Sequence, residues 1–154
     1  MVTIFLLAFV TAAYAGYNLF IKLATGHVPA GTTSTVLATM TMQAMTLIAS
    51  LVFFGALKLQ GGHVFTLPPR AFLWAAVAGI SIGTAEIAYY YLFSGIGQTR
   101  SIETNVAVPF IVGGTIAVVG LASIFLLKES FGWPQALGTL LIIGGIALTF
   151  LRGH

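Results

Sequence analysis

The chain has 154 residues, of which 58% are hydrophobic, and only nine charged side chains, six Lys or Arg and three acidic. Charged residues make up 6% of the chain, against roughly 25% in an ordinary soluble domain. Because a soluble fold needs a polar surface, a water-soluble enzyme is excluded. The net charge of +3 comes from scattered cations rather than a basic patch, so we expect no nucleic-acid partner.

Five apolar stretches approach the length of about 20 residues that crosses a bilayer as a helix. Breaks rich in Gly and Pro separate them, and helices joined by such short loops are antiparallel neighbours. We predict one all-α, polytopic transmembrane domain over residues 1–154. The first stretch has no basic segment before it and exceeds the usual signal-peptide core, so it is predicted to be a helix. The expected helices cover about residues 3–24, 33–57, 71–95, 102–127 and 133–151.

The first helix carries polar residues along one face. Thr11, Tyr14, Asn18 and Lys22 follow one another at spacings of three, four and four residues, which places them on the same side of a helix. Polar side chains are costly in lipid, so a continuous polar face predicts the lining of an interior substrate or ion pathway. For Lys22 the alternative is extension of its ammonium group to the lipid headgroups.

The second helix has a similar polar stripe, in which Thr39, Gln43 and Thr46 are the central positions, flanked by Thr35 and Ser50. A single Thr or Ser in a helix often bonds the carbonyl four residues earlier, and this is the alternative for each residue alone. Two stripes that also contain Asn and Gln favour a polar-lined pathway.

In the third helix, Glu86 shares a face with Tyr90. If the helix begins near Arg70, a rise of about 1.5 Å per residue places Glu86 roughly 22 Å into a hydrocarbon core of about 30 Å. A bare carboxylate at that depth costs at least a few kcal/mol, so Glu86 should be protonated, paired or exposed to water. Glu86 is therefore the candidate for proton coupling or cation binding. The alternative is a structural ion pair with Lys22.

The fourth helix is expected to begin at Glu103, where an acidic residue complements the helix dipole. Further along, Gly113, Ala117 and Gly120 form a strip of small residues. Such strips allow close contact between transmembrane helices. We predict that this strip is part of a dimer contact.

Several segments resemble the EamA-type half of the drug/metabolite transporter superfamily. They are Pro109 in the fourth helix, FLLKE at residues 125–129, GTLLIIGG at 138–145, NLFIKLA at 18–24 and YYYL at 89–92. The resemblance implies a five-helix bundle that serves as one of two oppositely oriented halves. It also implies export or exchange of small metabolites or drugs across a bacterial or archaeal inner membrane. Glu86 lies outside the usual pattern and is a candidate for a specialisation of this chain.

The positively charged residues give no preferred orientation. Three lie on each side of the membrane: Lys58, Arg70 and Lys128 on one side, and Lys22, Arg100 and Arg152 on the other. Since Lys and Arg bias sets membrane orientation, we expect subunits of dual topology. Alternating access in this class uses two inverted repeats, so an antiparallel homodimer is predicted. The alternatives are a parallel dimer and a different chain that supplies the second half.

Cys and Asp are absent, and the three His residues show no ligand spacing. We therefore expect no metal site, no cofactor and no enzymatic activity. The predicted function is secondary-active transport of a small molecule by alternating access, with Glu86 as the candidate proton-coupling group. The competing hypothesis is a non-transporting accessory subunit of a larger membrane complex.

Overall fold

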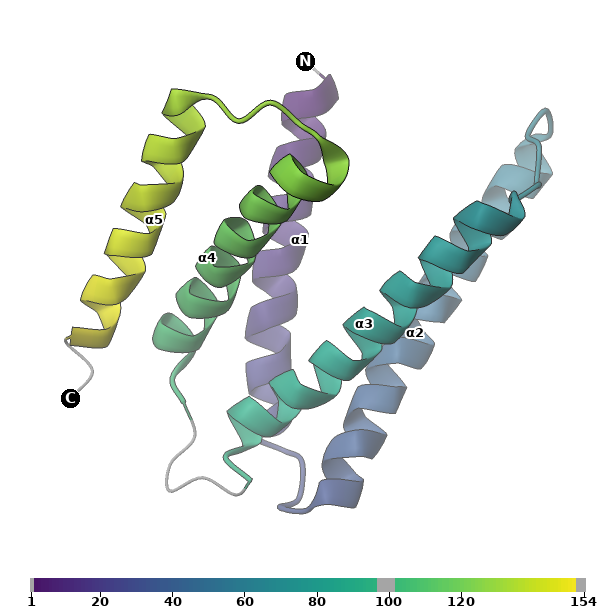
Figure 1. Ribbon diagram of the computed structural model, residues 1–154. Coiled ribbons are helices and arrows are strands. Elements are labelled where there is room, and N and C mark those ends of the chain that lie inside the picture. Colours follow the sequence, from purple (N-terminus) through teal and green to yellow (C-terminus); the bar gives the residue numbers. More distant parts are fainter. Residues whose placement is uncertain (1, 97–101, 152–154) are drawn as a thin grey trace. The chain divides into compact units, whose positions relative to one another are not determined.

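A computed structural model describes residues 2–96 and 102–151. In this part of the chain all regular structure is helical, with five α-helices (Figure 1). Helix α4 continues into a π-helical turn, η1 (Ser123–Leu127). The prediction of an all-α fold with five helices is confirmed, and the expected boundaries agree to within a few residues. The helices are α1 (Val2–Thr25), α2 (Thr32–Gln60), α3 (Pro69–Ser94), α4 (Thr104–Ala122) and α5 (Trp133–Leu151).

Four of the helical segments in the described residues are long and apolar enough to cross a membrane. They contain 24, 29, 26 and 23 residues and correspond to α1, α2, α3 and the segment Thr104–Leu126. The apolar segment Trp133–Leu148 of α5 is shorter. Large apolar side chains such as Phe5, Leu51 and Trp74 are exposed along these helices, as a lipid-facing surface requires. The chain is therefore an integral membrane protein by the length and composition of its helices.

The chain divides into two compact units, and the division falls within α1. The first unit contains α1 up to Asn18, together with α4, η1 and α5. The second unit contains α1 from Leu19, together with α2 and α3. Each unit is built around one helical hairpin, α4–α5 in the first and α2–α3 in the second.

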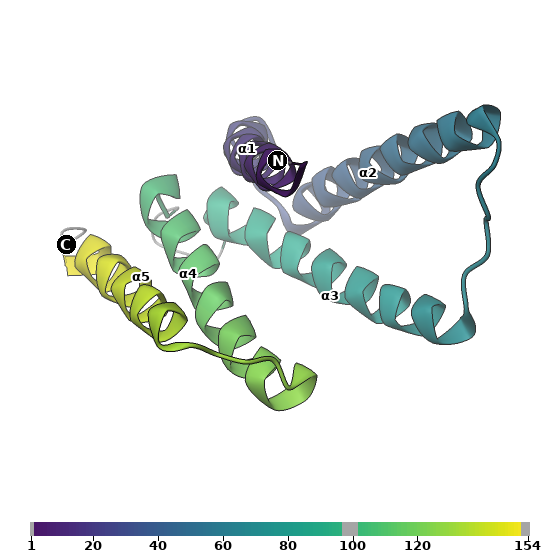
Figure 2. The same ribbon diagram turned by 90° about the horizontal axis from the view of Figure 1, so that it is seen from above.

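In the second unit, α2 and α3 diverge toward the loop that joins them, as the view from above shows (Figure 2). Their buried residues all lie at the opposite end, near the start of α2 and the end of α3. Pro69 is the first residue of α3, where its missing N–H costs no hydrogen bond. Gly95 ends α3 in a left-handed conformation, with φ of 70°, and its N–H donates to the Tyr91 carbonyl at 3.2 Å.

In the first unit, α4 packs against α5 at Gly113, which is buried. A Cβ atom at this position would overlap with Cδ1 of Ile146 and lie 3.3 Å from Cγ2 of Ile142. Gly113 thus lets the two backbones approach. Since its face is occupied by α5 of the same chain, the structure gives Gly113 a packing role inside the subunit. The other two residues of the predicted dimer contact, Ala117 and Gly120, are half-buried.

The two ends of the α4–α5 connection are held by local hydrogen bonds. The π-helical turn ends at Lys128, whose φ is 55°, and the Glu129 N–H donates to the Ser123 carbonyl at 3.2 Å. At the start of α5, the side-chain oxygen of Gln135 accepts a hydrogen bond from the Gly132 N–H at 2.5 Å. This is half of a capping box, and it satisfies an N–H that the helix leaves unpaired.

The start of α4 differs in detail from the prediction. Glu103 occupies the N-cap position, but its side chain makes no capping hydrogen bond. Its backbone carbonyl instead accepts from the N–H groups of Val106 and Ala107, at 3.1 and 2.9 Å. The expected fourth helix over 102–127 is also not uniform, since its last five residues widen into η1.

Candidate functional site

The buried polar side chains of the described residues are Thr25, Thr35, Thr39 and Glu86, with exposed fractions of 8%, 0%, 1% and 8%. We call this group the polar junction. All four belong to the second unit, in the end of α1, the first half of α2 and the second half of α3. Burying polar groups is costly in any apolar setting, so their concentration at one end of a membrane hairpin marks a candidate site.

A hydrogen bond between α2 and α3 shows which residues of the two helices lie opposite each other. The side-chain nitrogen Nε2 of Gln43 donates to the Gly83 carbonyl of α3 at 3.4 Å. A Cβ atom on Gly83 would lie 3.4 Å from the same nitrogen, an ordinary contact distance, so the amide packs directly against this glycine. Because the helices are antiparallel, one turn back along α2 from Gln43 corresponds to one turn forward along α3. Thr39 therefore lies at about the level of Glu86.

Glu86 lies on the buried face of α3. Tyr90 and Phe93 follow at spacings of four and three residues and are 4% and 2% exposed, so one helical stripe is buried from Glu86 to Phe93. The carboxyl group also interacts electrostatically with the phenol groups of Tyr89 and Tyr90. An ionisable group is thus buried near the Tyr89 and Tyr90 phenols in a helix long enough to span a membrane.

Lys22 contacts Phe93, the last residue of this buried stripe. Its ammonium nitrogen lies 5.1 Å from the centre of the Phe93 ring, a cation–π geometry. The rings of Phe93 and Tyr89 are themselves in edge-to-face contact, with centres 4.7 Å apart. Lys22 therefore contacts α3, and its cation is placed on the same stripe that carries the Glu86 carboxyl group.

The Thr hydroxyls bond within their own helices. The hydroxyls of Thr35 and Thr39 donate to the carbonyls of Gly31 and Thr35 at 3.1 and 3.0 Å, and Thr46 donates to Met42 at 3.1 Å. This is the alternative considered for each Thr alone. It has a chemical consequence, because a hydroxyl that has donated its proton presents only acceptor lone pairs to its surroundings. Thr35 and Thr39 thus add acceptor oxygens to a junction that already contains a carboxyl group.

The predicted pathway residues divide between the two units. Within the second unit, Thr39, Glu86 and Tyr90 are buried, while Lys22 and Gln43 are half-buried. Thr46 is exposed one turn beyond Gln43. The remaining residues belong to the first unit, where Thr11 and Tyr14 are exposed and Asn18 is half-buried, its side-chain nitrogen donating to the Tyr14 carbonyl at 2.8 Å. A common interior for all nine residues stays a prediction.

Two junction residues were missing from the predicted pathway. Thr25 follows Lys22 by three residues and so extends the polar face of the first helix by one turn. Thr35 was recognised only as a flank of the second stripe, although it is the most buried residue there. Continuing each stripe to the helix end would have found both. Arg100 and Arg152, which enter the charge balance, lie outside the described residues.

The polar junction contains the Glu86 carboxyl group and the acceptor hydroxyls of Thr35 and Thr39. The Lys22 ammonium group lies over the ring of Phe93, at the end of the buried stripe of α3. In the described part of the chain, the junction included, His and Glu side chains form no group of three that could hold a metal ion. Comparison with known proteins found no family model, no curated protein and no solved structure that matches this chain.

Proposed function

We propose that this chain is one half of a secondary-active transporter that exports or exchanges small metabolites or drugs by alternating access. The observation that carries the proposal is Glu86, which is 8% exposed within a helix long enough to span a membrane. Ionisable residues inside membrane segments are expensive and mark ion or substrate pathways. The EamA-type pattern in α1, α3, α4 and α5 supports membership of the drug/metabolite transporter superfamily.

The chemistry of the junction favours a proton or another cation as the ligand of Glu86. Thr35 and Thr39 present acceptor lone pairs, and neither hydroxyl has a proton left to donate to a carboxylate. In a proton-coupled cycle, Glu86 takes up a proton when the junction opens to one side of the membrane and releases it on the other. Substrate and proton then alternate at the same carboxyl group.

Transport by this route needs two repeats that move against each other around the site. The five helices supply one repeat, and we propose that a second, inverted copy supplies the other. The equal number of Lys and Arg residues on the two sides supports insertion in both orientations. The antiparallel homodimer is therefore our preferred assembly.

The decisive experiment is uptake by purified protein in liposomes under an imposed pH gradient, with a panel of amines and amino acids. We expect Glu86→Gln to abolish uptake driven by the pH gradient, because the amide cannot release a proton. Glu103→Gln is the matched control, since it removes an exposed acid at the start of α4, and it should retain uptake. Absence of uptake by folded wild-type protein across the panel would favour the accessory-subunit hypothesis.

A structural ion pair between Glu86 and Lys22 predicts a different result. In that case Glu86→Gln should lower the free energy of unfolding, by at most about 3 kcal/mol, because it leaves the half-buried Lys22 cation unpaired. Adding Lys22→Met should then restore stability. For a proton-coupling Glu86, the single variant unfolds like the wild type and loses only transport.

Orientation and access to the pathway can be measured separately. The chain has no Cys, so each introduced Cys is unique. Cys at Thr39 or Gln43 should react with a membrane-impermeant thiol reagent faster than Cys at Leu51 or Ile143. Reporters fused after His154 should be found on both sides of the membrane, and two added Lys residues there should drive them to one side. A single orientation of the unmodified chain would contradict the antiparallel homodimer.

A further inference from the structure

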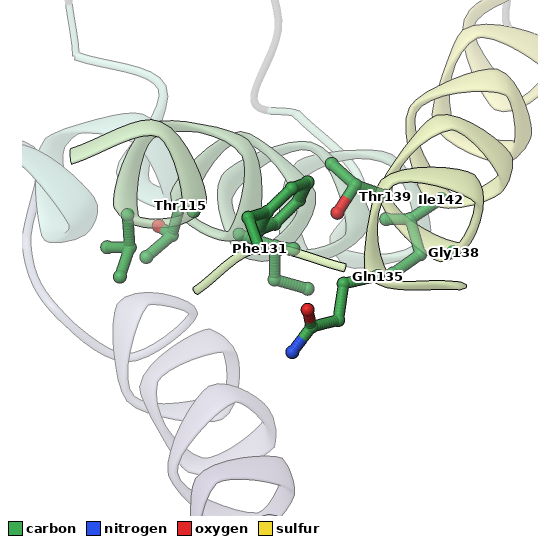
Figure 3. A pocket seen from close by; sticks show the side chains of 9 residues that line it. Thr115, Phe131, Gln135, Gly138, Thr139 and Ile142 are labelled. Atoms are coloured by element: carbon green, nitrogen blue, oxygen red, sulfur yellow. The ribbon is translucent and has the colours of Figure 1, made fainter. Parts of the chain in front are cut away.

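The α4–α5 hairpin contains a second feature, an open groove of about 510 Å³ (Figure 3). One wall is a face of α4 that includes Ile116, Val119 and Gly120, and the other is a face of α5 that includes Gly138 and Ile142. The two glycines carry no side chain into the space, and a Cβ on Gly138 would have nothing within 4 Å. The groove is therefore a gap left by small residues between two packed helices.

The lining is mostly apolar, with the Gln135 amide at its outer end and the hydroxyls of Thr115 and Thr139 further in. Ile116 and Ile142 make its deep end apolar, and the Thr115 hydroxyl at that end donates to the Ile111 carbonyl at 2.8 Å. The other end holds the Gln135 amide beside the ring of Phe131, close to the α4–α5 connection. Its oxygen accepts from the Gly132 N–H, so the NH₂ group of the same amide is turned away from that bond. From Gln135 to Ile142 the groove extends about 10 Å along α5.

The polar end corresponds to the edge of the membrane. It lies beside the connection between η1 and α5, which contains Lys128 and Glu129. Trp133, the first residue of α5, is 76% exposed there, a position typical of Trp at the level of the lipid headgroups. The apolar end then lies in the hydrocarbon region. An amphipathic molecule with a polar ester and an apolar chain would match this order.

We propose that this groove binds the acyl chain of a bilayer glycerophospholipid, with an ester carbonyl oxygen accepting a hydrogen bond from the Gln135 NH₂ group. The hydrocarbon region holds no water to fill the open groove, and an unfilled groove would deprive the lining atoms of dispersion contacts. This lipid would act as a wedge that sets the spacing of α4 and α5, independently of transport.

The test uses purified protein in maltoside micelles and a phosphatidylcholine with a photoreactive diazirine on its acyl chain. Gly138→Leu places a side chain in the groove. Gly144→Leu is the matched control, because it adds the same side chain to the same helix at a position with open space that does not line the groove. Gln135→Glu keeps the acceptor for the Gly132 N–H but removes the NH₂ donor. Cross-linked residues are identified by mass spectrometry of peptides.

We expect labelling of the wild-type groove to saturate with probe concentration and to be displaced by unlabelled phosphatidylcholine. Gly138→Leu should weaken the apparent affinity at least about tenfold, and Gln135→Glu about threefold, the effect of one membrane hydrogen bond. Gly144→Leu should bind like the wild type. Labelling that never saturates, that is equal on the outward residues Leu140 and Leu141, or that survives Gly138→Leu overturns the proposal. A cross-link from a second copy into the groove overturns it as well.

Discussion

The two helical hairpins of this chain are held together by different means. The α2–α3 hairpin contains the buried Thr35, Thr39 and Glu86, and its helices are linked by the amide of Gln43. In the α4–α5 hairpin, Gly113 packs against Ile146. Three of these four helices, α2, α3 and α4 with its extension to Leu126, are long and apolar enough to cross a membrane. In that setting lipid tails are as apolar as Leu and give no hydrophobic force for helix association.

The difference indicates that the two hairpins have different roles. Small residues are the usual means by which transmembrane helices pack, because they permit close van der Waals contact. The α4–α5 hairpin uses that means and needs no buried charge. The α2–α3 hairpin instead buries a carboxyl group, although an apolar residue would pack there at lower cost. We infer that α4–α5 is a scaffold and that the polar junction is retained for function.

The largest expected effect tests the scaffold. Gly113→Leu should lower the free energy of unfolding by about 2–3 kcal/mol, because the new side chain has no room against Ile146. Titration of micellar protein with a denaturing detergent measures this change. The neighbouring Gly114→Leu is the control, since a Cβ there has nothing within 4 Å. Adding Ile146→Ala to Gly113→Leu should recover part of the loss, and no recovery would place the clash elsewhere.

A smaller effect is expected at the outer end of the polar junction. Phe93→Leu should cost about 1 kcal/mol of unfolding free energy, because it removes the ring beneath the Lys22 ammonium group and beside Tyr89. The same substitution at Phe72, which is 66% exposed on the same helix, should be nearly neutral. Combining Phe93→Leu with Lys22→Met in a double-mutant cycle isolates the cation–π contribution. A coupling energy of zero would show that the cation–π contact does not stabilise the protein.

The hydrogen bond between α2 and α3 should contribute less. Gln43→Leu removes the donor to the Gly83 carbonyl, and such bonds in membrane proteins contribute about 0.6 kcal/mol on average. Gln60→Leu at the exposed end of α2 serves as the control. If Gln43→Leu were more stable than the wild type, the amide would be a functional residue kept at a cost in stability, and uptake assays on the same variant would then show a loss.

The smallest change in stability is predicted for Thr39→Val. Because the hydroxyl bonds a carbonyl of its own helix, its loss should alter the unfolding free energy by about 0.5 kcal/mol or less. Uptake driven by a pH gradient should nevertheless fall, because the substitution removes a hydrogen-bond acceptor that lies at about the level of Glu86. Thr41→Val is the control, an exposed Thr with the same local bond to Leu37. Equal uptake by both variants would argue against Thr39 as part of the site.

Much of the fold was predictable from the sequence because local composition decides it. In lipid a backbone must satisfy its own hydrogen bonds, so an apolar run of sufficient length forms a helix and Gly or Pro clusters end it. The observed boundaries at Thr25, Pro69 and Trp133 lie within two residues of those that this rule predicted, at 24, 71 and 133. The widening of α4 into η1 did not, because no Gly or Pro in Ser123–Leu127 marks it.

Helical spacing by itself determined which residues share a face, as for Thr35, Thr39, Gln43 and Thr46 on α2. Only the tertiary structure decided which part of that face is covered. Thr39 is buried and Thr46 is exposed, although they lie two turns apart on one stripe. The physical reason is that α2 and α3 converge at one end and diverge at the other (Figure 2). Likewise, the absence of a side chain at Gly113 permits a close contact, but the neighbour of Gly113, here Ile146 of the same chain, depends on packing between distant segments.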